Sequence, residues 1–326
     1  MRANLTQKGR RDRRLKFVGV LFVLLVIAAG GLGGAYSVAQ SRAHALEKAQ
    51  EAAAAAAAKP DPFKGISLIA KSAIVVDLKT GTVLYSQNAD TQLPLASITK
   101  VALVLAVSDA LSPESTIKIP QHTTPDGAPI RLAPGESWKT QDLMDFTLAA
   151  SSNEGAQELA RAAENGIASK YPQATPGAAT VWRMNDLAKS LGLQETYFLN
   201  PSGLDVSTTQ SGAYSSARDV AKLFAYAAST SPALFEATTD ASVTRSTLSG
   251  KTIVGENTNE ALPAIPGLIM GKTGYTDLAG GNLGVVFDVG PAHPVVAVVL
   301  GSTYDGRFQD MEAIVPRAQQ AVAQGR

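Results

Sequence analysis

Serine and lysine recur in this sequence at spacings that would support nucleophilic catalysis. In the segment PLASITK, residues 94–100, Ser97 stands three residues before Lys100. On a helix this spacing places the hydroxyl and the amine on one face, and the helix N-terminus would add positive potential beneath a reacting carbonyl. A lysine buried among apolar residues can lose its proton near neutral pH and serve as the base. The motif alone is weak, because a serine N-cap followed by a surface lysine has the same spacing.

Two further motifs carry groups that would suit the same reaction. Ser151-Ser152-Asn153 interrupts a helix-prone stretch, so it could bring a hydroxyl and an amide to a cleft, or it could be a plain helix–helix turn. Lys272-Thr273-Gly274 ends a strand-like run. Its lysine and threonine could hold a substrate carboxylate, and its glycine would let substrate approach the backbone. The same residues would also fit an ordinary transition from a strand to a turn.

Other catalytic chemistries have little support in the composition. The sequence contains no cysteine, which excludes thiolate nucleophiles, thiolate metal sites and disulfide scaffolds. Its three histidines, His44, His122 and His293, fall in an alanine-rich stretch, a polar loop and a turn. We expect ordinary surface histidines there rather than the base of a Ser-His-Asp triad. No metal site and no cofactor are implied.

Hydrophobic periodicity supplies the elements that must position these motifs. Alternating or branched apolar runs predict strands over residues 66–76, 82–86, 265–274, 281–289 and 294–301. Apolar residues three and four apart predict helices over 98–111, 138–163 with a break at the polar triplet, 181–192, 216–228 and 311–323. A hairpin first, helices in the middle and strands last indicate an α+β fold with an antiparallel sheet.

The N-terminal region has a different character from the rest of the 326 residues. Residues 1–16 carry seven basic residues against one acidic residue, and no charge follows until after Tyr36. Residues 17–36 are long enough to span a hydrocarbon core of about 30 Å, and the preceding positive charge predicts a cytoplasmic N-terminus with an exported body. A signal peptide cleaved near residues 37–39, which would release the body as a secreted protein, is the alternative.

An alanine-rich linker over residues 37–61 follows the predicted anchor. It contains a run of seven alanines and ends in Pro60-Asp61-Pro62, which predicts a helical spacer without an apolar stripe. The exported body then covers residues 62–326. This body is acidic on balance, because the net charge of the whole chain is only +1. The body therefore lacks the excess of positive charge that binding to nucleic acid requires.

The order Ser-x-x-Lys, Ser-x-Asn, Lys-Thr-Gly resembles that of penicillin-binding proteins and class A β-lactamases. The wider context resembles the serine D-Ala-D-Ala carboxypeptidases of the low-molecular-weight penicillin-binding class, the peptidase S11 family. Five segments carry this resemblance in the family's order, over roughly residues 66–301 and thus most of the body. They are PLASITK, IRLAPGESWKTQDLMDFTLAASSNEGAQELA, MNDLAKSLGLQETYFLNPSGLD, YSSARDVAKLFAYA and GLIMGKTGYTDLAGGNLGVVF.

This resemblance implies the fold, the reaction and a role for each motif residue. The fold would be α+β of the β-lactamase/DD-peptidase kind, with an antiparallel sheet flanked by helices and a helical subdomain. The enzyme would remove the terminal D-Ala from peptidoglycan stem peptides through an acyl-enzyme, and β-lactams would inhibit it covalently. The implied roles are Ser97 as nucleophile, Lys100 as general base, Ser151 as proton relay, Asn153 as ligand of the substrate amide, Lys272 and Thr273 as ligands of the terminal carboxylate, Gly274 as the residue that keeps the strand open, and the backbone N–H near Thr276 as the second oxyanion donor beside that of Ser97.

Two departures from the family pattern stand out. Ser152 replaces the usual glycine of the Ser-x-Asn motif, and its side chain could narrow the cleft. The chain also ends about 25 residues after the last predicted strand, whereas many relatives continue into a β-rich domain and a C-terminal membrane helix. We therefore expect residues 17–36 to supply the membrane anchor.

Two other functions remain open at this point. A class A-like β-lactamase would need a glutamate that activates the deacylating water, in a Glu-x-x-Leu-Asn pattern. Glu195 and the following residues through Asn200 come close but have one residue too many. A membrane-tethered peptidoglycan-binding protein without catalysis would share the fold. The absence of catalysis is disfavoured, because every motif residue keeps the side chain that the reaction needs.

Overall fold

The computed structural model describes residues 39–51, 54, 59–121 and 132–326. Its chain divides into two compact units, of which the first ends at Pro60 and the second covers Asp61–Gln324 with Arg326. In the first unit, residues 39–51 form an exposed helix, as expected for the linker. The predicted membrane anchor, residues 17–36, lies outside the described residues. Within the described part of the chain, no helix is both long and apolar enough to span a bilayer.

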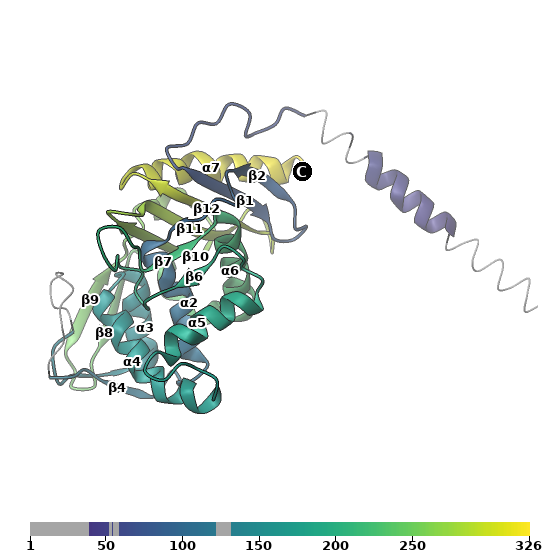
Figure 1. Ribbon diagram of the computed structural model, residues 1–326. Helices are drawn as coiled ribbons and strands as arrows, with labels where there is room; N and C mark the ends of the chain where they lie inside the picture. Colours follow the sequence, from purple (N-terminus) through teal and green to yellow (C-terminus); the bar gives the residue numbers. More distant parts are fainter. Residues whose placement is uncertain (1–38, 52–53, 55–58, 122–131) are drawn as a thin grey trace, which may run out of the picture. The chain divides into compact units, whose positions relative to one another are not determined.

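A five-stranded antiparallel sheet forms the framework of the second unit (Figure 1). Its strand order is β10-β11-β12-β1-β2. The strands are β1 (Ser72–Asp77), β2 (Val83–Gln87), β10 (Leu268–Thr276), β11 (Gly280–Asp288) and β12 (Pro294–Ser302). The first strand of the sheet in the sequence, β1, thus pairs with the last, β12, and β10 is left as an edge strand. The predicted α+β class and the antiparallel pairing of the late strands are confirmed.

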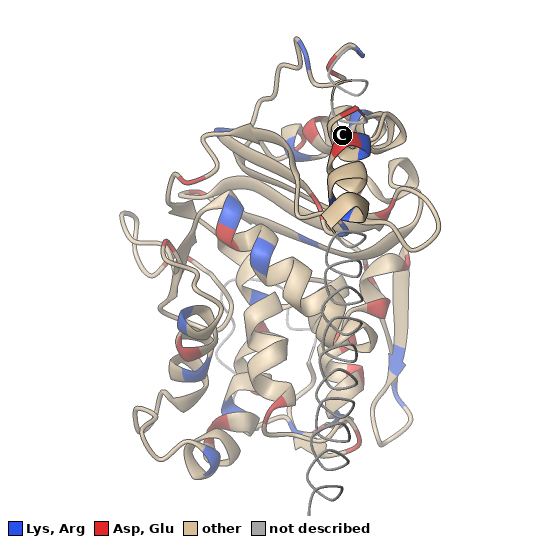
Figure 2. Ribbon diagram, turned by 90° about the vertical axis from the view of Figure 1, so that its right-hand side faces the viewer, with Lys and Arg blue, Asp and Glu red and all other residues tan. Residues whose placement is uncertain are grey.

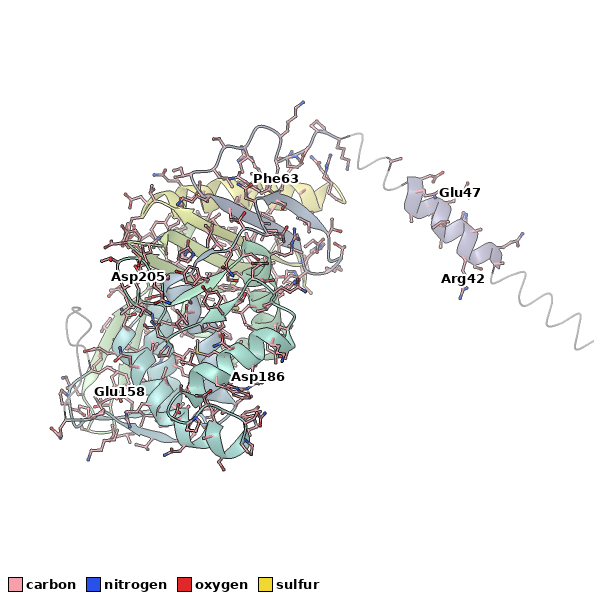
Figure 3. All side chains as sticks on the ribbon, in the orientation of Figure 1. Arg42, Glu47, Phe63, Glu158, Asp186 and Asp205 are labelled. Atoms are coloured by element: carbon pink, nitrogen blue, oxygen red, sulfur yellow. The ribbon has the colours of Figure 1, made fainter. Side chains whose placement is uncertain are left out.

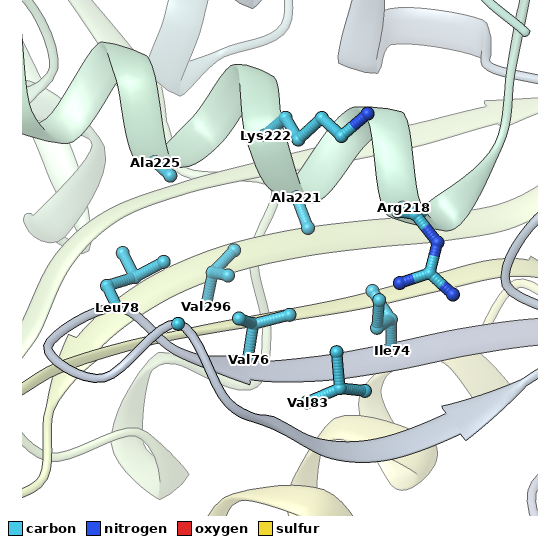
Figure 4. Close-up of a pocket in the computed structure, with 10 residues that line it drawn as sticks. Ile74, Val76, Leu78, Val83, Arg218, Ala221, Lys222, Ala225 and Val296 are labelled. Atoms are coloured by element: carbon cyan, nitrogen blue, oxygen red, sulfur yellow. The ribbon is translucent and has the colours of Figure 1, made fainter. Parts of the chain in front are cut away.

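One long helix packs on each face of this sheet. Helix α6 (Ala217–Thr230) contacts β1, β11 and β12, and α7 (Gly306–Ala323) contacts the same three strands from the other side. Between α6 and the edge strand β2, a cavity of about 210 Å³ is lined by apolar side chains including Ile74, Val76 and Val83 (Figure 4). Arg218 and Lys222 of α6 border it, and Arg218 pairs there with Asp90.

The helical region holds the residues between the first hairpin and the late strands. It contains α2 (Lys100–Ser108), α3 (Thr140–Ala149), α4 (Asn153–Lys170) and α5 (Ala179–Ser190). Residues 101–107 of α2 are all buried, so this helix is the centre of the larger hydrophobic core. The ribbon positions of Lys, Arg, Asp and Glu fall mainly on helices and loops, and most of the sheet is free of these colours (Figure 2).

Several predicted boundaries are shifted in the structure. The first strand begins at Ser72 rather than Ile66, because the backbone N–H groups of Ile69 and Ala70 donate to the buried carboxylate of Asp310 instead of pairing in the sheet. The predicted helix from residue 138 begins at Thr140, because Trp138 lies in the short strand β5 (Ser137–Lys139). The last helix begins five residues earlier than expected, at Gly306.

The sequence analysis missed the short pairings outside the main sheet. These are β8 (Ser242–Ser246) with β9 (Thr252–Glu256), β4 (Thr116–Lys118) with β5, and β3 (Leu93–Pro94) with β7 (Ala213–Ser215) and β6 (Tyr197–Phe198). Strands of two to five residues give little periodicity to detect. The β8–β9 hairpin packs on α3, where the backbone of Gly255 lies against the ring of Phe146.

Candidate active site

The Ser-x-x-Lys motif lies where the chain enters α2. Ser97 belongs to the 3₁₀ turn η1 (Ala96–Thr99), and Lys100 is the first residue of the α-helix. In a 3₁₀ turn, side chains three residues apart eclipse one another. The Nζ atom of Lys100 lies 2.7 Å from the Oγ atom of Ser97, as a nucleophile and its base require.

Two further oxygen atoms hold the amine of Lys100. It donates to the side-chain oxygen of Asn153 at 2.8 Å and to the backbone carbonyl of Ser202 at 3.0 Å. The Lys100 side chain is completely buried, so these polar contacts compensate for the lost hydration of the amine. The structure thus joins the first and second motifs and adds the loop at Ser202, which the sequence analysis did not predict.

A second lysine joins the Lys-Thr-Gly motif to the Ser-x-Asn motif. Lys272, in the middle of β10, donates to the Oγ atom of Ser151 at 2.8 Å and to the carbonyl of Thr273 at 3.0 Å. Its side chain is 2% exposed. Each lysine therefore has one candidate catalytic serine as a partner: Lys100 has Ser97, and Lys272 has Ser151.

Burial and positive neighbours destabilise the charged form of Lys272. Loss of hydration lowers the pKa of its amine well below the ordinary value, and the nearby charges of Lys100 and Arg307 lower it further. Among the described residues, no carboxylate lies within ion-pair distance of its amine. An anionic group entering this space would supply the missing counter-charge.

The turn that carries Ser97 is strained and tightly enclosed. Ala96 and Ser151 both adopt positive φ angles, +50° and +55°, which side-chain-bearing residues rarely do and which are common at functional sites. Glycine is required on two sides of this turn. A Cβ atom on Gly203 would come within 2.0 Å of the Ala96 carbonyl, and one on Gly274 would come within 2.7 Å of the Leu95 carbonyl. Gly274 thus brings β10 against the backbone of the turn that carries Ser97.

Two buried polar side chains hold the sheet against this turn. Asn282 of β11 donates to the carbonyls of Pro94 and Leu95, each at 3.0 Å, and accepts from the N–H of Gly301. Arg307 of α7 donates to the carbonyl of Gly274 at 2.8 Å. Its guanidinium also lies 4.3 Å from the centre of the Tyr304 ring. Both residues therefore fix the position of β10 relative to Ser97.

Thr273 and Thr276, the other motif residues on β10, have hydroxyl partners. The Thr273 hydroxyl lies 2.6 Å from that of Thr258. The Thr276 hydroxyl donates to Asp205 at 3.0 Å and accepts from the N–H of Ala279 (Asp205 is labelled in Figure 3). These are side-chain contacts, and the oxyanion role of the backbone near Thr276 stays a prediction.

Ser152 has a structural role that accounts for its side chain. It is the N-cap of α4, and its Oγ atom accepts from the backbone N–H of Gly155 at 3.0 Å. The residue is 7% exposed. The hydroxyl is therefore directed into the first turn of the helix.

Glu195 has no contact with the groups around Ser97 in the described part of the chain. It is exposed, and its backbone bonds to Asp219 and Gln92. The environment of the glutamate thus gives no support to the β-lactamase alternative.

Five residues that position the motifs were not singled out from the sequence. Ser202, Asp205 and Asn282 fall inside segments that carried the family resemblance. The resemblance therefore pointed to these segments, but it did not indicate which side-chain contacts they make. Thr258 and Arg307 fall outside those segments. Their roles depend on contacts with residues 15 and 33 positions away, which periodicity does not reveal.

Comparison with solved structures defines the class of this fold. The chain is similar to penicillin-binding protein D2 from Listeria monocytogenes in its ampicillin-bound form, with a TM-score of 0.65 and 29% sequence identity. The match covers 80% of this chain and 99% of that one. The expected penicillin-binding and DD-peptidase fold is confirmed.

The sequence comparisons narrow this class to one family. Residues 53–303 match the peptidase S11 model, described as D-alanyl-D-alanine carboxypeptidase. The chain is 32% identical to the D-alanyl-D-alanine carboxypeptidase DacB2 of Mycobacterium tuberculosis over 73% of its length and 77% of the relative. It belongs to the peptidase S11 family. It is also 32% identical to DacF of Bacillus subtilis over 64% of its length, although it spans only about half, 51%, of that relative.

The lowered pKa of Lys272 predicts a pH-dependent affinity for carboxylates. A peptide ending in D-Ala-D-Ala should bind the Ser97→Ala variant more weakly as the pH rises through that pKa, because the amine then loses its charge. The decline should occur well below the pH at which an exposed lysine titrates. Calorimetric titration across pH measures it, with the C-terminal amide of the same peptide as a control. An equally steep decline for the amide would assign the effect to another group.

The capping contact of Ser152 predicts an effect on stability rather than on rate. Ser152→Ala should lower the free energy of unfolding by about 1 kcal/mol, and Ser152→Gly by only a few tenths. Acylation by benzylpenicillin should stay within roughly twofold of wild type, since neither change removes a group that faces Ser97. Chemical denaturation and stopped-flow acylation measure the two quantities. Markedly faster acylation of the glycine variant would show instead that Ser152 narrows the cleft.

Proposed function

We propose that this protein is a serine-type D-alanyl-D-alanine carboxypeptidase that removes the terminal D-Ala of peptidoglycan stem peptides. The observation that carries the proposal is the 2.7 Å contact between Lys100 and Ser97 in the same buried site where Lys272 contacts Ser151. Membership of the peptidase S11 family gives the substrate class. Since none of the ion pairs between described residues includes Lys272, whose pKa burial lowers, the site is suited to a substrate that brings its own carboxylate.

The reaction would proceed in two steps at Ser97. In the first, neutral Lys100 accepts the hydroxyl proton of Ser97 while the oxygen attacks the carbonyl between the two D-Ala residues. The peptide bond breaks, the proton that Lys100 took passes through Ser151 to the released amine, and an ester to Ser97 remains with Lys100 neutral again. In the second, water deprotonated by Lys100 hydrolyses that ester and restores the serine. The N–H of Ser97 and a second N–H near Thr276 would stabilise the oxyanion in both steps.

The remaining motif residues would hold the substrate. The side-chain oxygen of Asn153 accepts from Lys100, and the NH₂ group of the same amide would hydrogen-bond a substrate peptide group. Lys272 and Thr273 would bind the terminal carboxylate, which explains a lysine buried without an anionic partner in the described structure. Endopeptidase action on cross-links would use the same residues. β-Lactams would acylate Ser97, as the ampicillin-bound state of the Listeria relative suggests by analogy.

The cellular setting is also part of the proposal. We infer that residues 17–36 anchor the protein in the cytoplasmic membrane, with residues 1–16 inside and the catalytic unit outside. The seven basic residues ahead of an uncharged apolar segment support this orientation, and the helix over residues 39–51 suits a spacer. Cleavage near residues 37–39 would give a secreted enzyme with the same active site.

A direct assay of D-Ala release tests the proposed reaction. The full-length protein should release D-Ala from diacetyl-L-Lys-D-Ala-D-Ala, and Ser97→Ala should lower the rate by roughly 10³-fold or more, because the nucleophile is lost. Ser207→Ala, which changes an exposed serine, is the matched control and should retain wild-type activity. A wild-type protein that binds the peptide without releasing D-Ala would be a binding protein instead.

A further inference from the structure

A hydroxyl outside the three motifs reaches the carboxylate-binding strand. The Oγ atom of Thr258 lies 2.6 Å from the Oγ atom of Thr273, a short contact for two hydroxyl groups. Thr273 is 4% exposed, and Thr258 is half-buried in the segment between β9 and β10. The Thr258 side chain thus contacts the threonine that the proposed function assigns to the substrate carboxylate.

The backbone around Thr258 is fixed by its two neighbouring asparagines. Asn257 donates to the carbonyls of Thr238 and Asp240 at 2.9 and 2.8 Å and accepts from the N–H of Asn259 at 2.9 Å. The side chain of Asn259 in turn accepts from the N–H of Ala261. These bonds form a rigid turn, so the Thr258 hydroxyl is preorganised.

This turn is also connected to two parts of the active site. The N–H of Thr258 donates to the carbonyl of Ala149, two residues before Ser151. Thr238, which accepts from Asn257 through its carbonyl, accepts through its hydroxyl from the N–H of Gly271 on β10. Thr258 is therefore held relative to both the Ser151 segment and the strand that carries Lys272.

The direction of the hydrogen bond between Thr258 and Thr273 determines whether Thr273 can donate to a ligand. Each hydroxyl carries one proton, and the bond between them uses only one. If Thr273 donates, its proton is unavailable to an incoming carboxylate. If Thr258 donates, Thr273 keeps its proton for the anion, and a hydrogen bond to an anion is stronger than one between neutral groups.

We propose that Thr258 is a positioning residue for carboxylate recognition: its hydroxyl donates to Thr273 and so directs the Thr273 proton toward the carboxylate of the ligand. The inference rests on the proposed function for the identity of that ligand. Thr258 and Thr273 then form a chain of two hydrogen-bond donors that ends at the carboxylate of the ligand.

The test compares acylation by benzylpenicillin with acylation by its methyl ester, which lacks the carboxylate charge. Thr258→Val should lower the rate with benzylpenicillin roughly threefold to tenfold, the loss expected for one neutral hydrogen bond, and should leave the rate with the ester nearly unchanged. Thr258→Ser should restore the wild-type rate. Thr244→Val, at an exposed threonine of β8, is the matched control and should change neither rate.

A double-mutant cycle separates an indirect role from a direct one. In a Thr273→Val background, Thr258→Val should cause no further loss, because Thr258 acts through Thr273. A loss that adds to that of Thr273→Val, an equal loss with the ester, or an unchanged or faster reaction with benzylpenicillin would each overturn the inference. A wild-type protein that benzylpenicillin acylates but that releases no D-Ala would refute the proposed function alone, and the acylation comparison would still decide the role of Thr258.

Discussion

Lys100 and Lys272 bring two amines into one buried junction between the helical region and the sheet. Burying a lysine is costly, and placing two near each other adds repulsion between their charges. The surrounding oxygen atoms of Ser97, Asn153 and Ser202 on one side and of Ser151 and Thr273 on the other offset this cost. Burial and the nearby charges of Lys100 and Arg307 still lower the pKa of the Lys272 amine well below its ordinary value, so this amine lacks a counter-charge that an anionic ligand could supply.

The architecture around this junction follows from the need to hold three distant chain segments together. Gly203 and Gly274 allow two backbones to approach the turn before Ser97 more closely than a Cβ atom would permit. Asn282 and Arg307 then bind the same region through backbone carbonyls. These contacts surround Ala96 and maintain its positive φ angle, because strained conformations persist only where the surroundings determine them.

Much of this arrangement could be predicted from the sequence, and the rest depended on contacts between distant residues. The motif residues were found by their chemical types and short spacings. In the structure Lys100 contacts Ser97 and Asn153, and Lys272 contacts Ser151 of the same motif as Asn153. Long periodic elements such as α6 and β12 were also predictable.

The errors have physical causes. The first strand was placed too early because nothing in its own residues indicates that Asp310, 240 positions later, binds the N–H of Ala70. The β8–β9 hairpin was missed because its strands are short and mostly exposed on one face. Thr258 could not be assigned for a similar reason: its hydroxyl has a meaning only beside Thr273.

The central claim is that Ser97, with Lys100 as its base, is the serine that becomes acylated. The most direct measurement is the intact mass of the full-length protein after mixing with benzylpenicillin, followed over time beside Ser97→Ala. We expect one penicilloyl group per wild-type chain and no adduct in the variant. The wild-type adduct should persist, because Glu195, the glutamate nearest to the deacylating pattern in the sequence, is exposed and bonds through its backbone to Asp219 and Gln92. An adduct on the Ser97→Ala protein, or none on wild type, would contradict the account.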